Sequence, residues 1–158
     1  MTEGTRWKFA LFIVVLVALH FVLRVGLGMG YLAPDLLAVA LLLASRRLRP
    51  GMAAGLGFLL GVLEGSANPF VFGYASLALA VLGYAGSRSR EWLAGDDPLT
   101  MVAFFFAGTL LYEILLYVFL AVGGVGGSPM APLIPAVVAS IYAAAVGLGA
   151  STLYRSLA

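Results

Sequence analysis

The sequence contains no cysteine and little charge. Only 10% of its 158 residues are charged, whereas soluble domains carry roughly 25%. The lack of cysteine excludes a disulfide framework and thiolate chemistry. The chain has a single histidine and neither a G-x-S-x-G nor an H-E-x-x-H motif, so the residue sets of the common hydrolases and zinc enzymes are missing. We therefore expect no enzymatic activity and no cofactor.

Long apolar runs take the place of these features. Hydrophobic residues make up 63% of the chain, and the mean hydropathy is +1.07. A hydrocarbon core about 30 Å thick requires about 20 apolar residues per helix, and several such runs are separated by short polar breaks. The pattern predicts one all-α domain over residues 1–158, a polytopic membrane protein with six transmembrane helices in one bundle. The predicted helices are 7–25, 34–47, 51–64, 70–87, 98–122 and 133–154.

Two of the predicted helices, 34–47 and 51–64, are short. Fourteen residues rise only about 21 Å, which is less than the hydrocarbon thickness. The turn between them carries Arg46, Arg47 and Arg49, and three unpaired guanidinium groups cannot rest in hydrocarbon. The turn must therefore reach water or headgroups. Local thinning of the bilayer, or burial inside the bundle, would accommodate the short helices.

The basic residues are distributed unevenly between the two sides of the predicted bundle. With six spans, both termini, the turn after the second helix and the loop after the fourth lie on one side. That side holds eight of the nine basic residues: Arg6, Lys8, Arg46, Arg47, Arg49, Arg88, Arg90 and Arg155. The other side holds only Arg24. The positive-inside rule then predicts that both termini are cytoplasmic. Because the basic residues lie in loops rather than on an aromatic-interleaved face, we expect no nucleic-acid partner.

Five ionisable residues fall at membrane depth, all in the outer half of the predicted bundle: His20, Arg24, Asp35, Glu64 and Glu113. At 1.5 Å per residue, Glu113 lies roughly 13 Å below the outer end of its helix, His20 about 9 Å and Arg24 about 3 Å. His20 thus matches the depth of Glu113. Arg24 is better placed to meet Asp35 and Glu64 at the rim.

Glu113 stands inside the apolar segment "LLYEILLYVF", next to Tyr112 and near Tyr117. A buried carboxyl group needs hydrogen-bond partners or protonation, and the two phenols are possible donors. Three interpretations remain open for this glutamate: a buried polar group that fixes helix packing, a proton- or ion-coupling group, or part of a partner-binding face. A cation held near the outer face by the histidine and the three carboxylates is a fourth.

Small residues recur at helical spacing in two segments. The first, "GMAAG", "GFLLG" and "GVLEG", contains Gly51, Gly55, Gly57, Gly61 and Gly65. The second, in 133–154, contains Ala136, Ser140, Ala143, Gly147 and Ser151. Such stripes let neighbouring helix backbones approach closely. They predict either packing within the bundle or an outward face that receives a partner's transmembrane helix, for which 133–154 is the best candidate.

Three segments together resemble the rod shape-determining protein MreD family: "PDLLAVALLLASRR", "GLGFLLGVLEGSANPFVFGYASLALAVLGYAG" and "LLYEILLYVF". The order and spacing of these segments carry the resemblance. The family's acidic positions at the end of the third helix and within the fifth fall on Glu64 and Glu113. Its proline at the start of the second helix falls on Pro34. The resemblance implies no catalytic role for these residues.

Membership of this family would imply a non-enzymatic scaffold of the cell-elongation complex in the bacterial inner membrane. The implied direct partner is MreC. Through MreC the complex would regulate a SEDS glycosyltransferase and a penicillin-binding protein in peptidoglycan synthesis, with MreB filaments on the cytoplasmic face. The implied fold is similar to that of substrate-binding subunits of energy-coupling factor vitamin transporters, and such a subunit is the alternative function. The first helix, "FALFIVVLVALHFVLR", lacks the A-x-x-x-A pair usual in those subunits, which favours the scaffold.

Overall fold

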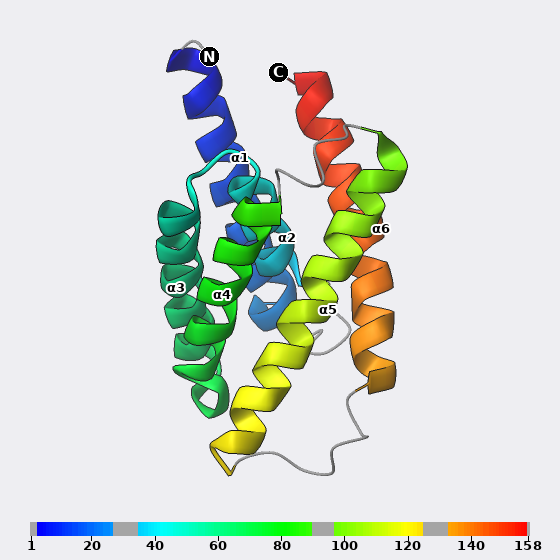
Figure 1. The fold of residues 1–158 in the computed structure, drawn as a ribbon. Coiled ribbons are helices and arrows are strands. Elements are labelled where there is room, and N and C mark those ends of the chain that lie inside the picture. Colours follow the sequence, from blue (N-terminus) through cyan, green and yellow to red (C-terminus); the bar gives the residue numbers. More distant parts are fainter. Residues whose placement is uncertain (1–2, 27–34, 90–96, 125–132, 158) are drawn as a thin grey trace.

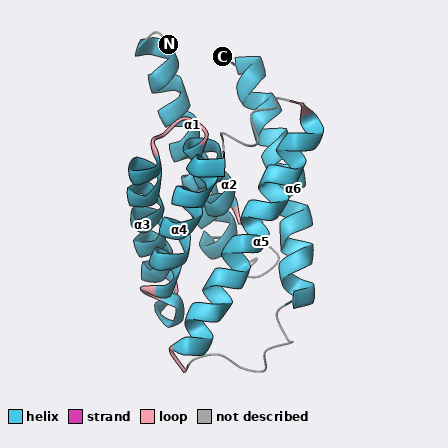
Figure 2. Ribbon diagram, in the orientation of Figure 1, coloured by secondary structure: helices cyan, strands magenta, loops and turns pink. Residues whose placement is uncertain are grey.

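The computed structural model describes residues 3–26, 35–89, 97–124 and 133–157. These residues form six α-helices and no strand (Figure 2), which confirms the predicted all-α class. The α-helices are α1 (Glu3–Phe21), α2 (Leu36–Ser45), α3 (Pro50–Ala67), α4 (Tyr74–Ser89), α5 (Pro98–Val122) and α6 (Leu133–Leu157). Two short elements complete the order: the π-helix η1 (Val22–Gly26) after α1 and the 3-10 helix η3 (Pro69–Val71) before α4.

The helices run alternately along one bundle axis (Figure 1). The first turn of α1, the turn between α2 and α3, and the last turn of α6 lie at the same end. We call this the terminal end; η1 and η3 lie toward the other, the distal end. The most extensive helix contacts join α3 to α4 and α5 to α6. An even number of alternating helices thus places the start and finish of the chain together.

Helix α2 forms the centre of the bundle. All ten of its residues, Leu36 to Ser45, are buried, and the helix contacts α1, α3, α4, α5 and α6. Ten residues rise about 15 Å, about half the thickness of a hydrocarbon core. A helix that is apolar on every side must be enclosed by protein or by lipid, and here the other helices enclose it. Of the two ways to accommodate a short second helix, burial inside the bundle is the one observed.

Within the described residues, four helices are long and apolar enough to cross a membrane, judged by length and composition: Trp7–Arg24, Pro50–Ala67, Pro98–Val122 and Ile134–Tyr154. Their outward side chains include large apolar groups that a soluble protein would bury, such as Leu59 at 62% exposure and Val138 at 60%. Such surfaces are stable against acyl chains. The structure therefore supports a helical membrane protein.

The expectation that the third helix is short was wrong. It was predicted to end at Glu64, but α3 continues to Ala67 and spans 18 residues. The residues after Glu64 are small and do not interrupt a helix. The helix ends only at Asn68, with φ −136° and ψ 93°, because Pro69 disfavours a helical conformation in the residue that precedes it.

The predicted start of the fourth helix at residue 70 was also wrong. Pro69–Val71 form a 3-10 turn, and Gly73 has a φ of +83°, a left-handed conformation that glycine adopts without steric cost. Helix α4 begins after it, at Tyr74. The helix predicted over 98–122 is observed with the same bounds. Two residues named in the sequence analysis, Pro34 and Arg90, lie outside the described residues.

Candidate functional site

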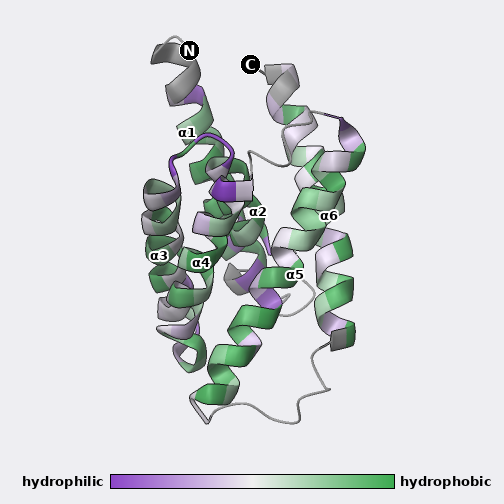
Figure 3. Ribbon diagram, viewed as in Figure 1, coloured by the Kyte–Doolittle hydropathy of each residue, from purple (hydrophilic) through white to green (hydrophobic). Residues whose placement is uncertain are grey.

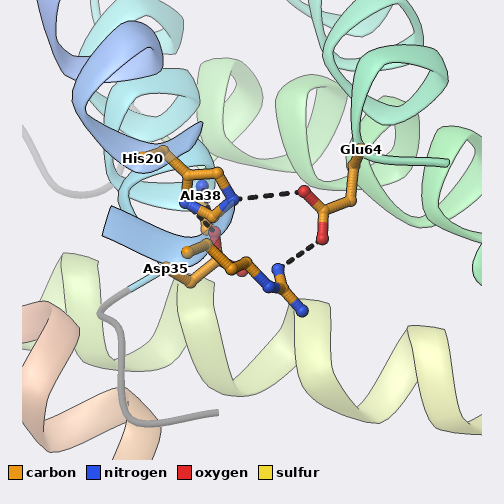
Figure 4. Close-up of polar contacts among 5 residues, drawn as sticks. His20, Asp35, Ala38 and Glu64 are labelled. Atoms are coloured by element: carbon orange, nitrogen blue, oxygen red, sulfur yellow. Dashed lines mark hydrogen bonds and ion pairs between the residues drawn. The ribbon is translucent and has the colours of Figure 1, made fainter. Parts of the chain in front are cut away.

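Glu64, near the distal end of α3, joins the polar groups of three helices. Its side chain is 4% exposed. One carboxylate oxygen accepts a hydrogen bond from Nη1 of Arg24 in η1, and the other lies 3.1 Å from Nε2 of His20 in α1. Figure 4 shows His20 and Glu64 pointing toward each other across the gap between their helices. Because a carboxylate only accepts hydrogen bonds, Nε2 is the protonated nitrogen in this contact.

His20 also faces the start of α2. Its side chain is 1% exposed, and Nδ1 lies 3.9 Å from Oδ1 of Asp35 without a hydrogen-bond partner in the described part of the chain. The same Asp35 oxygen accepts a hydrogen bond of 3.1 Å from the backbone N–H of Ala38 and so caps the N-terminus of α2. We call His20, Arg24, Asp35 and Glu64 the distal network.

The capping role of Asp35 was not predicted from the sequence. A signal was present, since aspartate directly before an apolar run is a preferred N-cap residue. The cap fixes the carboxylate at the point where α2 enters the bundle. Asp35 is thereby held beside His20 by the helix that it begins.

Glu113 lies beside the distal network and is not part of its contacts. Its side chain on α5 is half-buried and lies within electrostatic range of Asp35 and Arg24. The adjacent Tyr112 is buried, at 4% exposure. The structure thus gathers all five predicted ionisable residues into one region and joins four of them directly.

The depth argument anticipated the partner of Arg24 but did not give the partners of His20. Arg24 pairs with Glu64, as expected at the rim. His20 contacts Glu64 and Asp35 instead of the depth-matched Glu113. Rise along a helix gives the level of a residue and not the direction in which its side chain points. The direction here follows from helix packing, because α1 packs on α2.

The small residues of α3 mostly serve packing against α4. A Cβ atom added at Gly57 would collide with the carbonyl group of Leu79, and one at Gly61 would collide with the backbone of Ser76. A Cβ atom at Gly65 would likewise collide with Phe72. In contrast, a Cβ at Gly51 or Gly55 would meet no atom within 4 Å. Glycines on the inner face therefore let the two backbones touch, while the other two face outward.

The stripe on α6 also faces inward. All five predicted residues are buried: Ala136, Ser140, Ala143, Gly147 and Ser151. A Cβ at Gly147 would collide with the ring of Phe105 on α5. The Oγ atom of Ser151 lies 3.5 Å from the sulfur of Met101, also on α5. These residues make the α5–α6 interface, so the interpretation of this stripe as an outward face for a partner was wrong.

The described residues contain no group of three or more histidine and acidic side chains arranged to hold a metal ion. A cavity of about 420 Å³ lies between α3 and α4 and is lined by apolar residues such as Phe58, Val62 and Leu77. None of the distal network lines it. The network's partners are protein groups, and its effect is to tie η1 and α1 to α2 and α3.

Comparisons with protein-family models, with curated proteins and with solved structures find no match to this chain. The described residues form an apolar helical bundle with a buried polar network near its distal end.

Proposed function

We propose that this protein is a six-span, non-enzymatic scaffold of the bacterial cell-elongation complex, which docks MreC in the inner membrane. The observation that carries the scaffold role is the distal network. Glu64 is satisfied by Arg24 and His20, and Asp35 is engaged at the cap of α2. These groups are held by the protein itself, as expected of a bundle whose exterior performs the function.

The proposed topology has both termini in the cytoplasm. Lys8, Arg47, Arg49 and Arg88 all belong to segments at the terminal end of the bundle, and Figure 3 draws the α2–α3 turn there as a hydrophilic band. Arg24 belongs to η1 toward the distal end. Excess positive charge marks the cytoplasmic side. Helices α2 and α4 complete the six segments, α2 within the bundle and α4 against α3.

Cysteine labelling tests this topology, because the native chain has no cysteine. Ser66 at the distal end of α3 and Ser156 at the terminal end of α6 are both exposed. In intact cells, a membrane-impermeant maleimide is expected to label Ser66→Cys. It should label Ser156→Cys only after the membrane is permeabilised. The reverse pattern contradicts cytoplasmic termini.

The choice of MreC as partner rests on the resemblance of three segments to the MreD family. In that setting the scaffold would couple MreC to a SEDS glycosyltransferase and a penicillin-binding protein, near MreB filaments. A single-span partner would meet the bundle through its transmembrane helix. The long, apolar exteriors of α1, α3, α5 and α6 are the surfaces open to such a helix.

Co-purification is the direct experiment. This chain and MreC from the same genome, expressed together, are expected to elute as one complex in mild detergent. Recovery of each protein alone, with both well expressed, contradicts the scaffold proposal. Recovery with a transporter ATPase module and a bound vitamin would support the alternative of a vitamin-binding subunit.

Photo-crosslinking from individual helices then locates the docking face. Exposed positions are available on α1 (Val14, 62%), α3 (Leu59, 62%) and α6 (Val138, 60%). Leu41 on α2 is 0% exposed and is the internal control. A crosslinker at one exposed position should capture MreC, and a crosslinker at Leu41 should not. Equal capture from all three exposed positions would indicate random collision.

A further inference from the structure

The guanidinium group of Arg47, in the turn between α2 and α3, is stacked against two aromatic rings. Its Cζ lies 4.1 Å from the ring centroid of Phe9 on α1 and 4.8 Å from that of Tyr154 on α6. Nη1 donates a hydrogen bond of 3.1 Å to the Tyr154 hydroxyl. The two rings also pack edge to face, with their centroids 5.3 Å apart. The charge is thereby fixed where α1, α6 and the α2–α3 turn meet.

These contacts hold Arg47 without neutralising it. Its contacts among the described residues are with the aromatic side chains of Phe9 and Tyr154, and the ion pairs found there involve His20 and Arg24 instead. A guanidinium group carries five N–H donors, and Tyr154 accepts from one of its nitrogen atoms. Arg47 remains exposed. The remaining donors form a planar fork that matches two oxygens of one phosphate group.

The surroundings are those of a membrane interface. Trp7, at 74% exposure, and the exposed Lys8 precede Phe9 on α1, and the exposed Arg49 follows Arg47 in the turn. Aromatic and basic residues gather at the level of lipid headgroups, and basic sites between helices on the cytoplasmic side bind anionic headgroups. Further along α1, Leu11 and Val14 are exposed and apolar, which suits acyl chains.

We propose that Arg47, supported by Arg49 and Lys8, binds the phosphate of an anionic phospholipid at the junction of α1, the α2–α3 turn and α6. The stacking rings hold the guanidinium group at headgroup level with its free donors toward the lipid. Phosphatidylglycerol fits because its net negative charge meets a cation that no carboxylate of the described residues pairs with. Zwitterionic lipids fit less well, because the positive group of the headgroup already compensates the charge of the phosphate. The site depends on membrane insertion and not on MreC.

Trp7 is a natural reporter for this site. The chain has two tryptophans, so Trp92→Phe leaves Trp7 as the only one. The full-length protein is reconstituted in phosphatidylcholine vesicles that contain either brominated phosphatidylglycerol or brominated phosphatidylcholine, whose acyl chains quench tryptophan at close range. Brominated phosphatidylglycerol is expected to quench Trp7 more strongly at equal mole fraction. Raising the salt concentration should reduce this preference, because screening weakens exposed charge interactions.

Three variants in the Trp92→Phe background separate a specific site from general attraction. Arg47→Gln should lower the relative affinity for phosphatidylglycerol about fivefold, the effect of one interfacial basic residue. Arg88→Gln removes the same charge at the same end of the bundle, on α4, and should leave the preference near the wild-type value. Arg49→Gln changes an exposed side chain outside the stack of Arg47, Phe9 and Tyr154, so it tests the site without disturbing stacking. Its effect should lie between the other two.

Two results would overturn the proposal. One is equal quenching of the wild type by both brominated lipids. The other is an equal loss of preference in Arg47→Gln, Arg49→Gln and Arg88→Gln, which would indicate only attraction between a basic surface and an anionic membrane.

Discussion

His20 on α1 and Glu64 on α3 are 44 positions apart in the sequence, and Nε2 of the histidine lies 3.1 Å from a carboxylate oxygen of the glutamate. Both side chains are almost completely buried. In an apolar bundle inside a membrane, the polar groups have few other partners. The contact therefore fixes how α1 approaches α3, and Arg24 completes the pairing from η1.

The Arg24–Glu64 pair should contribute to stability mainly because neither charge can be left alone. Because Arg24 is 30% exposed and water can reach it, we expect Glu64→Leu to lower the free energy of unfolding by about 2 kcal/mol, less than the loss of one partner costs in a fully buried pair. The double variant Arg24→Leu/Glu64→Leu should recover part of this loss, because two apolar side chains need no partner. Thermal unfolding in detergent measures both. Losses that simply add in the double variant would contradict the pairing.

Glu113 should tolerate loss of its charge better than Glu64 does. Glu113 is half-buried and outside the contacts of the distal network, so Glu113→Gln is expected to cost less than about 1 kcal/mol. Glu64→Gln weakens two charge-assisted contacts and should cost more. Thermal unfolding in detergent compares Glu113→Gln directly with Glu64→Gln, since both variants make the same chemical change. If both were equally destabilised, Glu113 would belong to the network. If Glu113→Gln folded normally but lost function, charge or proton chemistry at Glu113 would be indicated.

The glycines of α3 offer a comparison within one helix. Gly57→Ala places a methyl group against the carbonyl of Leu79 and should destabilise the bundle by about 1–3 kcal/mol, since a tightly packed interface has no room for it. Gly55→Ala adds the same methyl group in open space and should be neutral or stabilising by up to about 1 kcal/mol, because alanine favours the helix. Thermal unfolding in detergent ranks the two. A stable Gly57→Ala would show that α3 and α4 can separate at no cost.

The cap of α5 predicts a pH dependence at the terminal end. The exposed carboxylate of Asp97 accepts hydrogen bonds from the hydroxyl of Thr100 at 2.6 Å and from its backbone N–H at 2.9 Å. These bonds lower the pKa of Asp97 below its ordinary value of 3.8. A lowered pKa means that the folded state favours the charged form, so the contribution to stability is complete above pH 3.8 and is lost as the pH falls through the folded-state pKa.

Asp97→Asn is the control for this effect, because asparagine still caps a helix and does not titrate. As the pH is lowered from about 5 to about 2, the unfolding temperature should fall more steeply for the wild type than for Asp97→Asn. Parallel curves would assign the acid sensitivity to other carboxylates.

Most of the helices could be predicted because their signals are local. Asp97 and Pro98 mark the start of α5, and the helix observed there has the predicted bounds. The errors at the ends of α3 and α4 also have local causes. The small residues after Glu64 continue α3 to Ala67, beyond the predicted end at Glu64. The left-handed conformation of Gly73 delays the start of α4.

The candidate site could be predicted only in part. The sequence indicated which ionisable groups share the outer half of the bundle, because depth follows from helix rise and topology. It did not indicate that His20 turns toward Glu64 instead of Glu113, since that depends on the rotation of each helix about its axis. In the same way, the spacing of the small residues did not distinguish Gly57, which packs against the Leu79 carbonyl, from Gly55, where an added Cβ would meet no atom within 4 Å.

The sequence by itself determined the membrane character, the helices and the asymmetry of basic charge, because hydropathy, breaker residues and loop composition act over a few residues at a time. Only the tertiary structure decided that α2 is enclosed by protein, that the α6 stripe faces α5, and that Arg47 is held between Phe9 and Tyr154. The physical reason is that a helix of apolar residues can satisfy its surface with either lipid or another helix. The choice depends on how all six helices pack together.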